Sequence, residues 1–195
     1  MNLRILVFAA LLASSGCSGA QEGAAYFPPI PAGGRLEYAV LLPGSHKETM
    51  WTRRDSDETI QGRTYMKYVS VISGIPGADP VVNYYRHAPE GIYRVDGKHK
   101  DAPEFLETPL PLTVGATWVS KGPEEEYRFT AEAIETVELV DRTYKDCLKL
   151  STVVDNASRG THTEVTSYLA PDIGAVRVVA RANGMTMELL RQGLR

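Results

Sequence analysis

The chain has few of the features that identify an enzyme or a metalloprotein. Of its 195 residues only two are cysteine and four are histidine. It contains no G-x-S-x-G or H-E-x-x-H pattern and no glycine-rich phosphate-binding loop. His46, His87, His99 and His162 lack the mutual spacing of metal ligands. The sequence therefore predicts no catalytic residues, no metal site and no cofactor.

An excess of positive charge is also missing. The chain has 21 Lys and Arg against 24 Asp and Glu, which gives a formal charge of −3. A mildly acidic chain of mixed charge lacks the basic face that nucleic acid requires. Anionic lipid headgroups are not expected to attract such a chain as a whole.

Long hydrophobic runs are scarce, and the one clear example lies near the N terminus. Arg4 is followed by an unbroken apolar run at residues 5–13 and then by Ser-Ser-Gly-Cys at residues 14–17. This order of charge, apolar core and small residues is typical of a secretory signal. The run is well short of the roughly 20 residues that span a bilayer. Export is therefore predicted, and removal of Arg4 with the signal takes the formal charge from −3 to −4.

Residues 14–17 resemble the lipobox of bacterial lipoproteins, although Ser14 stands where that motif usually has Leu. The resemblance implies a signal peptide at residues 1–16 and acylation of Cys17, with palmitate as one acyl chain. Two or more such chains suffice for stable membrane anchoring. Ser18 stands where lipoproteins retained in the inner membrane carry Asp, which points to the outer membrane, facing the periplasm or the cell surface. The alternative is cleavage near Gly19, which gives a soluble periplasmic or secreted protein.

The mature chain divides into a short linker and one domain. Residues 17–34 are rich in Gly, Ala and Pro and predict a tether after the acylated cysteine. Residues 35–195 are close to the size of a single domain. With Cys17 acylated, Cys147 has no disulfide partner, and it is interpreted as a small buried hydrophobe rather than a reactive thiol.

From residue 35 onward, apolar and polar residues alternate with period two, and β-branched and aromatic residues are frequent. The pattern predicts an all-β domain, an antiparallel meander curled into an open barrel, a half-barrel or a sandwich. Strands are expected at residues 35–42, 47–54, 64–73, 81–87, 91–95, 118–120, 125–140, 147–154, 161–169, 175–182 and 185–191.

Two connections are distinctive. Asn183-Gly184 predicts a two-residue type I′ hairpin turn, because that turn needs positive φ twice. Residues 97–113 contain three prolines and show no alternation. That segment is either a flap over a cavity or a surface crossover between two parts of the sheet.

Three segments, LPLTVGATW at residues 110–118, YKDCLK at 144–149 and YLAPDIGAVR at 168–177, follow one another in a recognisable order. Over residues 110–195 the chain resembles uncharacterised bacterial envelope lipoproteins of β-rich families of unknown function. Asp172 and Ala175 depart from the Gly and Leu of that pattern. The resemblance implies a β-rich fold and brings no catalytic residues.

Two hypotheses for function remain open. In the first, a non-catalytic outer-membrane lipoprotein serves as an accessory or scaffold subunit of an envelope assembly and contacts another envelope protein. In the second, the concave face of the sheet carries or senses a lipid or another apolar ligand. The residues expected to line that ligand site are Tyr65, Met66, Tyr68, Tyr84, Tyr85 and Tyr93.

Overall fold

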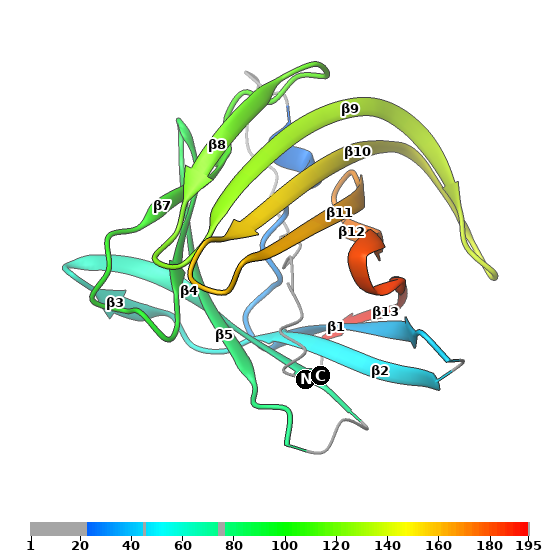
Figure 1. Cartoon of the computed structure of the whole chain (residues 1–195), viewed down its shortest axis with the longest axis horizontal. Coiled ribbons are helices and arrows are strands. Elements are labelled where there is room, and N and C mark those ends of the chain that lie inside the picture. Colours follow the sequence, from blue (N-terminus) through cyan, green and yellow to red (C-terminus); the bar gives the residue numbers. More distant parts are fainter. Residues whose placement is uncertain (1–22, 45, 74–76, 195) are drawn as a thin grey trace.

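The computed structural model describes residues 23–44, 46–73 and 77–194, and this part of the chain is all-β (Figure 1). The predicted fold class is confirmed. The predicted signal peptide and Cys17 lie outside the described residues. Two short 3₁₀ turns, η1 (Ala24–Tyr26) and η2 (Arg181–Asn183), accompany the strands.

The strands form a single antiparallel sheet that curls into a barrel. Their bounds are β1 (Gly34–Leu42), β2 (His46–Arg54), β3 (Glu58–Ile60), β4 (Arg63–Ile72), β5 (Val81–Ala88), β6 (Gly91–Asp96), β7 (Phe105–Pro109), β8 (Thr117–Lys121), β9 (Glu126–Glu138), β10 (Thr143–Asn156), β11 (Thr161–Ala170), β12 (Gly174–Ala180) and β13 (Met185–Leu194). The alternation at residues 125–140 therefore correctly predicted a strand, despite the alanines and glutamates that would also suit a helix.

The order around the barrel is β7-β6-β5-β4-β2-β1-β13-β12-β11-β10-β9-β8, with β3 paired to β4 beside this path. Consecutive strands are neighbours almost everywhere, as expected of a meander. The two ends of the order are β7 and β8, which no main-chain ladder joins among the described residues. The barrel is thus nearly closed, with one seam between these two strands, and β1 and β13 lie on the opposite side (Figure 1).

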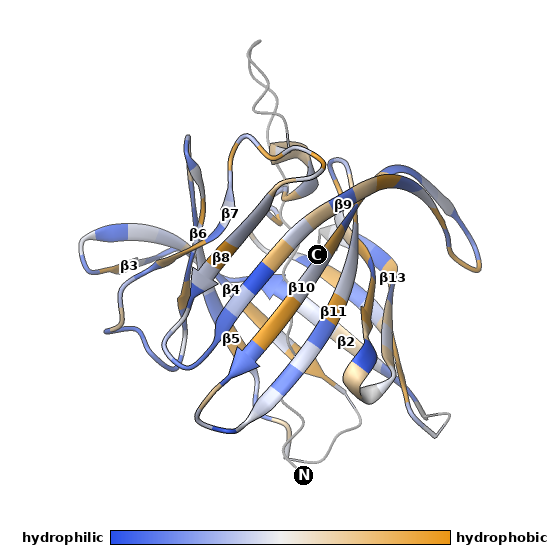
Figure 2. Ribbon diagram, turned by 45° about the horizontal axis from the view of Figure 1, so that its top comes forward, coloured by the Kyte–Doolittle hydropathy of each residue, from blue (hydrophilic) through white to orange (hydrophobic). Residues whose placement is uncertain are grey.

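Because every pairing is antiparallel, the connections gather at two rims. The rim where β1 begins, here called the entry rim, also carries the turns at residues 89–90, 110–116, 139–142 and 171–173. The opposite rim, called the far rim, carries the connections at 97–104, 122–125, 157–160 and 181–184. The long β9–β10 hairpin extends beyond its neighbours and curves away from the barrel (Figures 1 and 2).

Residues 23–33, here called the entry segment, pack into the entry rim. Phe27 and Ile30 are 8% and 1% exposed and belong to the barrel core. The backbone N–H of Ile30 donates to the Tyr68 hydroxyl (3.1 Å), and Arg54 donates to the Ile30 carbonyl (3.2 Å). Burying Ile30 alone is worth about 1.5–3 kcal/mol. Part of the predicted tether, the entry segment, therefore packs against the barrel.

The barrel interior holds one continuous apolar cluster. Inward positions alternate with outward polar positions along the strands, as the bands along β9 show (Figure 2). Largest among the fully buried side chains are Tyr38, Tyr68, Tyr84 and Tyr85, and all of these except Tyr84 lie in the barrel cluster. The ring of Tyr68 meets that of Tyr85 edge to face at 5.4 Å. The barrel interior is therefore lined by buried aromatic and aliphatic side chains that pack against one another.

The connections differ from two of the sequence-based expectations. β12 and β13 are joined by four residues, Arg181–Asn183 in η2 and then Gly184 at φ 63, so the two-residue type I′ turn is wrong. The 3₁₀ turn needs positive φ only at the glycine that ends it. Residues 97–113 contain the strand β7, which the prolines concealed.

The remaining loop, residues 97–104, packs on the outside of the barrel instead of covering a cavity. Lys100 pairs with Glu58, and Glu104 pairs with Arg63 and Arg86. Beneath these ion pairs lies a second, smaller apolar cluster, formed by Ile60, Tyr65, Tyr84 and Val95. The loop is therefore a surface crossover, and the flap interpretation is wrong.

Candidate functional site at the barrel seam

The seam between β7 and β8 is closed by side chains that bind main-chain groups. The indole N–H of Trp118 on β8 donates to the carbonyl of Glu107 on β7 (2.9 Å). The hydroxyl of Ser120, also on β8, donates to the carbonyl of Leu106. These bonds satisfy two acceptors on an edge strand that no neighbouring strand pairs.

A row of aromatic rings crosses the seam on the inner side. Phe105 of β7 stacks on Tyr127 of β9 (5.8 Å between ring centroids), Tyr127 lies against Phe129 (6.1 Å), and Phe129 stacks on Trp118 (4.9 Å). Because β9 pairs with β8, this row joins the two sides of the seam by ring contacts.

Behind the row lies a buried ion pair, formed by Arg94 of β6 and Glu107 of β7. Their side chains are 7% and 8% exposed, with both nitrogen–oxygen contacts at 3.3 Å. The Arg94 guanidinium lies over the rings of Phe105 (4.7 Å) and Tyr127 (4.9 Å). Two charges are thus held in the apolar interior by each other and by two ring faces.

Burial acts on both members of this pair. It lowers the pKa of Arg94, but Glu107, Tyr127 and Tyr85 together outweigh it and leave that pKa above the ordinary value. For Glu107 burial dominates and raises the pKa of the carboxyl, while Arg94 opposes the shift. Arg94 therefore stays charged, and Glu107 is the member whose charge depends on its partner.

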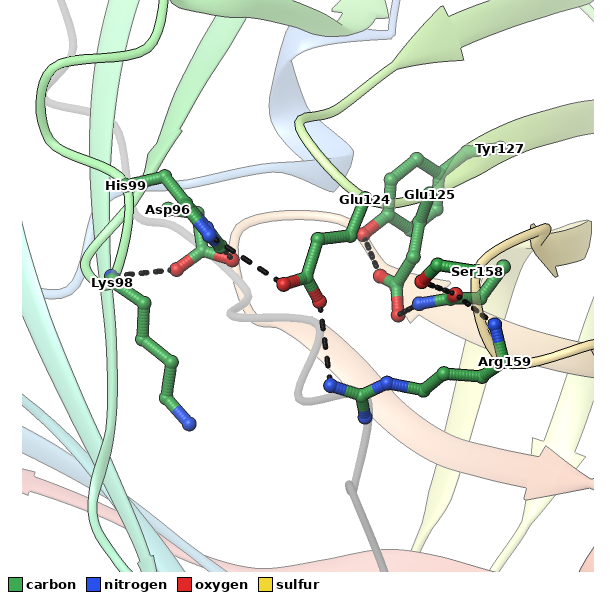
Figure 3. A network of polar contacts seen from close by, with 9 residues as sticks. Asp96, Lys98, His99, Glu124, Glu125, Tyr127, Ser158 and Arg159 are labelled. Atoms are coloured by element: carbon green, nitrogen blue, oxygen red, sulfur yellow. Dashed lines mark hydrogen bonds and ion pairs between the residues drawn. The ribbon is translucent and has the colours of Figure 1, made fainter.

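A polar network closes the far-rim end of the seam (Figure 3). His99, in the loop before β7, lies between Asp96 (3.7 Å) and Glu124 (3.5 Å), and Glu124 is in the turn after β8. Arg159, from the β10–β11 turn, contacts the other oxygen of Glu124 (3.4 Å). The next carboxylate, Glu125, accepts hydrogen bonds from Tyr127 and from Asn156. The network thus ties three connections together across the seam.

The chemistry available at the seam is that of binding and closure. Arg94 and Glu107 form an ion pair with each other. Among the described residues, no serine or cysteine nucleophile is hydrogen-bonded to a histidine. No group of three His, Cys, Asp or Glu side chains in the described ranges has the geometry to hold a metal ion. Within those ranges there is also no helix long and apolar enough to cross a bilayer.

The structure divides the predicted ligand-binding residues between the two faces of the sheet. Met66, Tyr68 and Tyr85 pack in the barrel interior. Tyr65 and Tyr84 belong to the outer cluster, and Tyr93 faces outward beneath Arg86 (4.5 Å). Since neighbours along a strand point to opposite faces, the adjacent pairs Tyr65-Met66 and Tyr84-Tyr85 cannot share a site. The structure therefore does not bring the six residues together.

Cys147 lies at an irregular pairing of β9 and β10 and is fully buried. Burial raises the pKa of its thiol to about 11. The thiol is therefore protonated at neutral pH, as the interpretation of a small buried hydrophobe requires.

The sequence analysis missed Arg94 and Glu107. A signal for Arg94 was present, because it shares strand parity with the buried Ile92 while its neighbours Tyr93 and Val95 face outward. A charge at an inward position indicates a buried partner. Glu107 gave no such signal, since its strand was hidden between prolines.

No protein-family model and no curated protein matches this chain. Among solved structures, the chain is similar to a Bacteroides fragilis protein described as a "putative exported protein with YMCC-like fold". The two are 11% identical, the TM-score is 0.47, and the match covers 85% of this chain and 97% of the other.

Proposed function

We propose that this protein is a non-catalytic lipoprotein, acylated at Cys17, that serves as an accessory or scaffold subunit of an outer-membrane assembly. The observation that carries the proposal is the division of the six predicted ligand-binding residues between the two faces of the sheet. Met66, Tyr68 and Tyr85 belong to the inner apolar cluster, whereas Tyr65 and Tyr84 lie in the outer one, so these residues do not form one ligand site. The outer face and the exposed connections of such a barrel can present surfaces to another protein.

The path of the entry segment supports anchoring. Gly23 is packed against Leu112 at the entry rim, and the amide of Asp172 donates to the carbonyl of Ala25 (2.8 Å). Five residues lie between Cys17 and Gly23, and a chain of that length reaches at most about 20 Å. An acyl group on Cys17 would therefore hold the entry rim close to the bilayer.

Two features argue against the carrier hypothesis. Tyr68 and Tyr85 contact each other directly, and Tyr68 also binds the backbone of Ile30. An apolar ligand at Tyr68 would have to compete with Ile30, which belongs to the same apolar cluster.

Anchoring is tested by metabolic labelling with palmitate. Wild-type protein should carry label and sediment with outer membranes, whereas Cys17→Ser protein should carry none. Label that survives in the Cys17→Ser variant would contradict acylation at that residue. A lipid adduct in the native mass spectrum of the Cys17→Ser protein would instead support the carrier hypothesis.

The scaffold role is tested by site-specific photo-crosslinking in intact cells. The tip of the β9–β10 hairpin is the preferred position, because Val140 is fully exposed there. A crosslinker at Val140 should give one discrete adduct, while the same group at the exposed His162 serves as control. Monomer alone at both positions would argue against a partner at this hairpin.

A further inference from the structure

Most of the outer surface balances charge locally. On β9 to β13, basic and acidic side chains face each other across strands, as in the pairs Lys149 with Glu132 (2.9 Å) and Arg177 with Glu188 (2.7 Å). Opposite charges at such cross-strand positions stabilise a sheet modestly. This surface is therefore explained by folding alone.

The outer face of β13, β1 and β2 near the entry rim differs. Arg35 lies directly opposite Arg53 in the register of β1 and β2, an arrangement of like charges that destabilises a sheet. Both guanidinium groups lie over the ring of the half-buried Trp51, at 5.0 and 5.5 Å. Together with Arg191 on β13, these residues form what is called here the arginine–tryptophan patch.

Acidic neighbours neutralise the patch only in part. Glu37 is shared between Arg191 (3.2 Å) and Arg35 (3.9 Å), and Asp55 pairs with Arg53 (2.7 Å). The side chains of Arg53 and Arg191 are 51% and 77% exposed. The patch thus holds three cations against two carboxylates, on a chain whose formal charge is −3.

We propose that the arginine–tryptophan patch rests on the anionic headgroup surface of the membrane, a deepening of the proposed anchoring. Guanidinium groups form bidentate hydrogen bonds with phosphate oxygens. Tryptophan is enriched at the interface between water and the lipid bilayer. The free energy of binding to an anionic membrane surface grows with the number of basic groups near that surface.

The position of the patch fits this role. It includes the first residues of β1, directly after the entry segment, on the side of the barrel opposite the seam. The negative charge of the remaining chain would turn other faces away from an anionic surface. The lipid anchor would then hold the barrel near the membrane, and the patch would set its orientation.

The test uses protein without an acyl group, so that its outcome does not depend on the anchor. The chain from residue 18 onward retains every residue of the described barrel. Its binding is measured by co-sedimentation with vesicles of mixed phosphatidylcholine and phosphatidylglycerol, and with phosphatidylcholine vesicles alone, at low ionic strength. We expect binding to the anionic vesicles, loss of that binding in high salt, and a shift of tryptophan fluorescence to shorter wavelength.

The double variant Arg35→Gln/Arg53→Gln should bind about thirtyfold more weakly, from about 1 kcal/mol for each basic group. The control Arg128→Gln/Arg181→Gln makes the same charge change on exposed arginines outside the patch and should leave binding unchanged. Equal loss in both variants, equal binding to the neutral vesicles, or no vesicle binding would each overturn the proposal.

Capture of soluble polyglutamate with no vesicle binding would point to an acidic protein partner. Failure of palmitate labelling would refute the anchor but leave these results intact.

Discussion

The two opposite walls of the barrel are held together by different means. On one side, β1 pairs with β13 over eight residue pairs, and inward residues such as Leu36, Met187 and Leu189 are at most 2% exposed. At the seam, β7 and β8 share no described ladder and are joined by side-chain hydrogen bonds, stacked rings and a buried ion pair. A barrel can therefore close by side-chain chemistry where its main chain stays unpaired. Closure of that kind depends on a few residues.

The largest effect is expected from breaking the buried pair at the seam. Glu107→Ala leaves the Arg94 charge buried without its partner, which should lower the free energy of unfolding by about 3–5 kcal/mol. Urea denaturation followed by tryptophan fluorescence measures the change. A loss of under about 1 kcal/mol would show that the pair is more solvated than its 7% and 8% exposures indicate.

A matched double variant separates the charge from the packing. Arg94→Met with Glu107→Leu removes both charges and keeps apolar volume at the seam, so it should be close to neutral. If the double variant is as unstable as Glu107→Ala, the hydrogen-bonding geometry of the pair matters more than burial of an unpaired charge.

The opposite wall should respond to loss of volume instead. Met187 is 1% exposed on β13 and sits in the apolar cluster. Met187→Ala should cost about 2–5 kcal/mol through lost burial and the cavity that remains. The amide hydrogen-exchange rates in β8 should increase only as much as the loss of global stability accounts for. Selective exchange in β8 would show that the two walls are coupled.

The sequence predicted the strands of this barrel better than its closure. Period-two alternation located the strands from β9 to β13, because each has one face in the core and one in water. The alternation gave no signal where a segment does not have one face in the core and one in water. β7 is an edge strand bounded by prolines, and the entry segment buries Phe27 and Ile30 without pairing into the sheet.

The candidate site could be predicted least, since its residues come together only when the ends of the sheet meet. Arg94 and Phe105 are local neighbours in the β6–β7 pair, but Tyr127 and Trp118 reach them across the seam. Strand periodicity states which face a residue occupies. It does not state which strands are brought side by side by curling of the sheet.

A smaller effect is expected from removing the indole hydrogen bond. Trp118→Phe keeps an aromatic ring against Phe129 but leaves the Glu107 carbonyl without its donor. The cost should be about 1–2 kcal/mol. Hydrogen exchange should show β8 opening before β13, since the seam has no ladder to hold it. Uniform exchange across the barrel would mean that stacking alone secures the seam.

The smallest effects come from two buried serines, one at the seam and one on β11, where the main chain is paired on both sides. Ser120 donates across the seam to the Leu106 carbonyl, whereas the hydroxyl of Ser167, on β11, is buried and has no hydrogen-bond partner among the described residues. Ser120→Ala should therefore cost about 0.5–1.5 kcal/mol. Ser167→Ala should be neutral or slightly stabilising, because it removes a polar group that is desolvated without a bond. Thermal unfolding of the two variants in parallel measures the difference. Equal destabilisation would show that Ser167 binds an internal water, and that the laddered part of the sheet depends on polar contacts as the seam does.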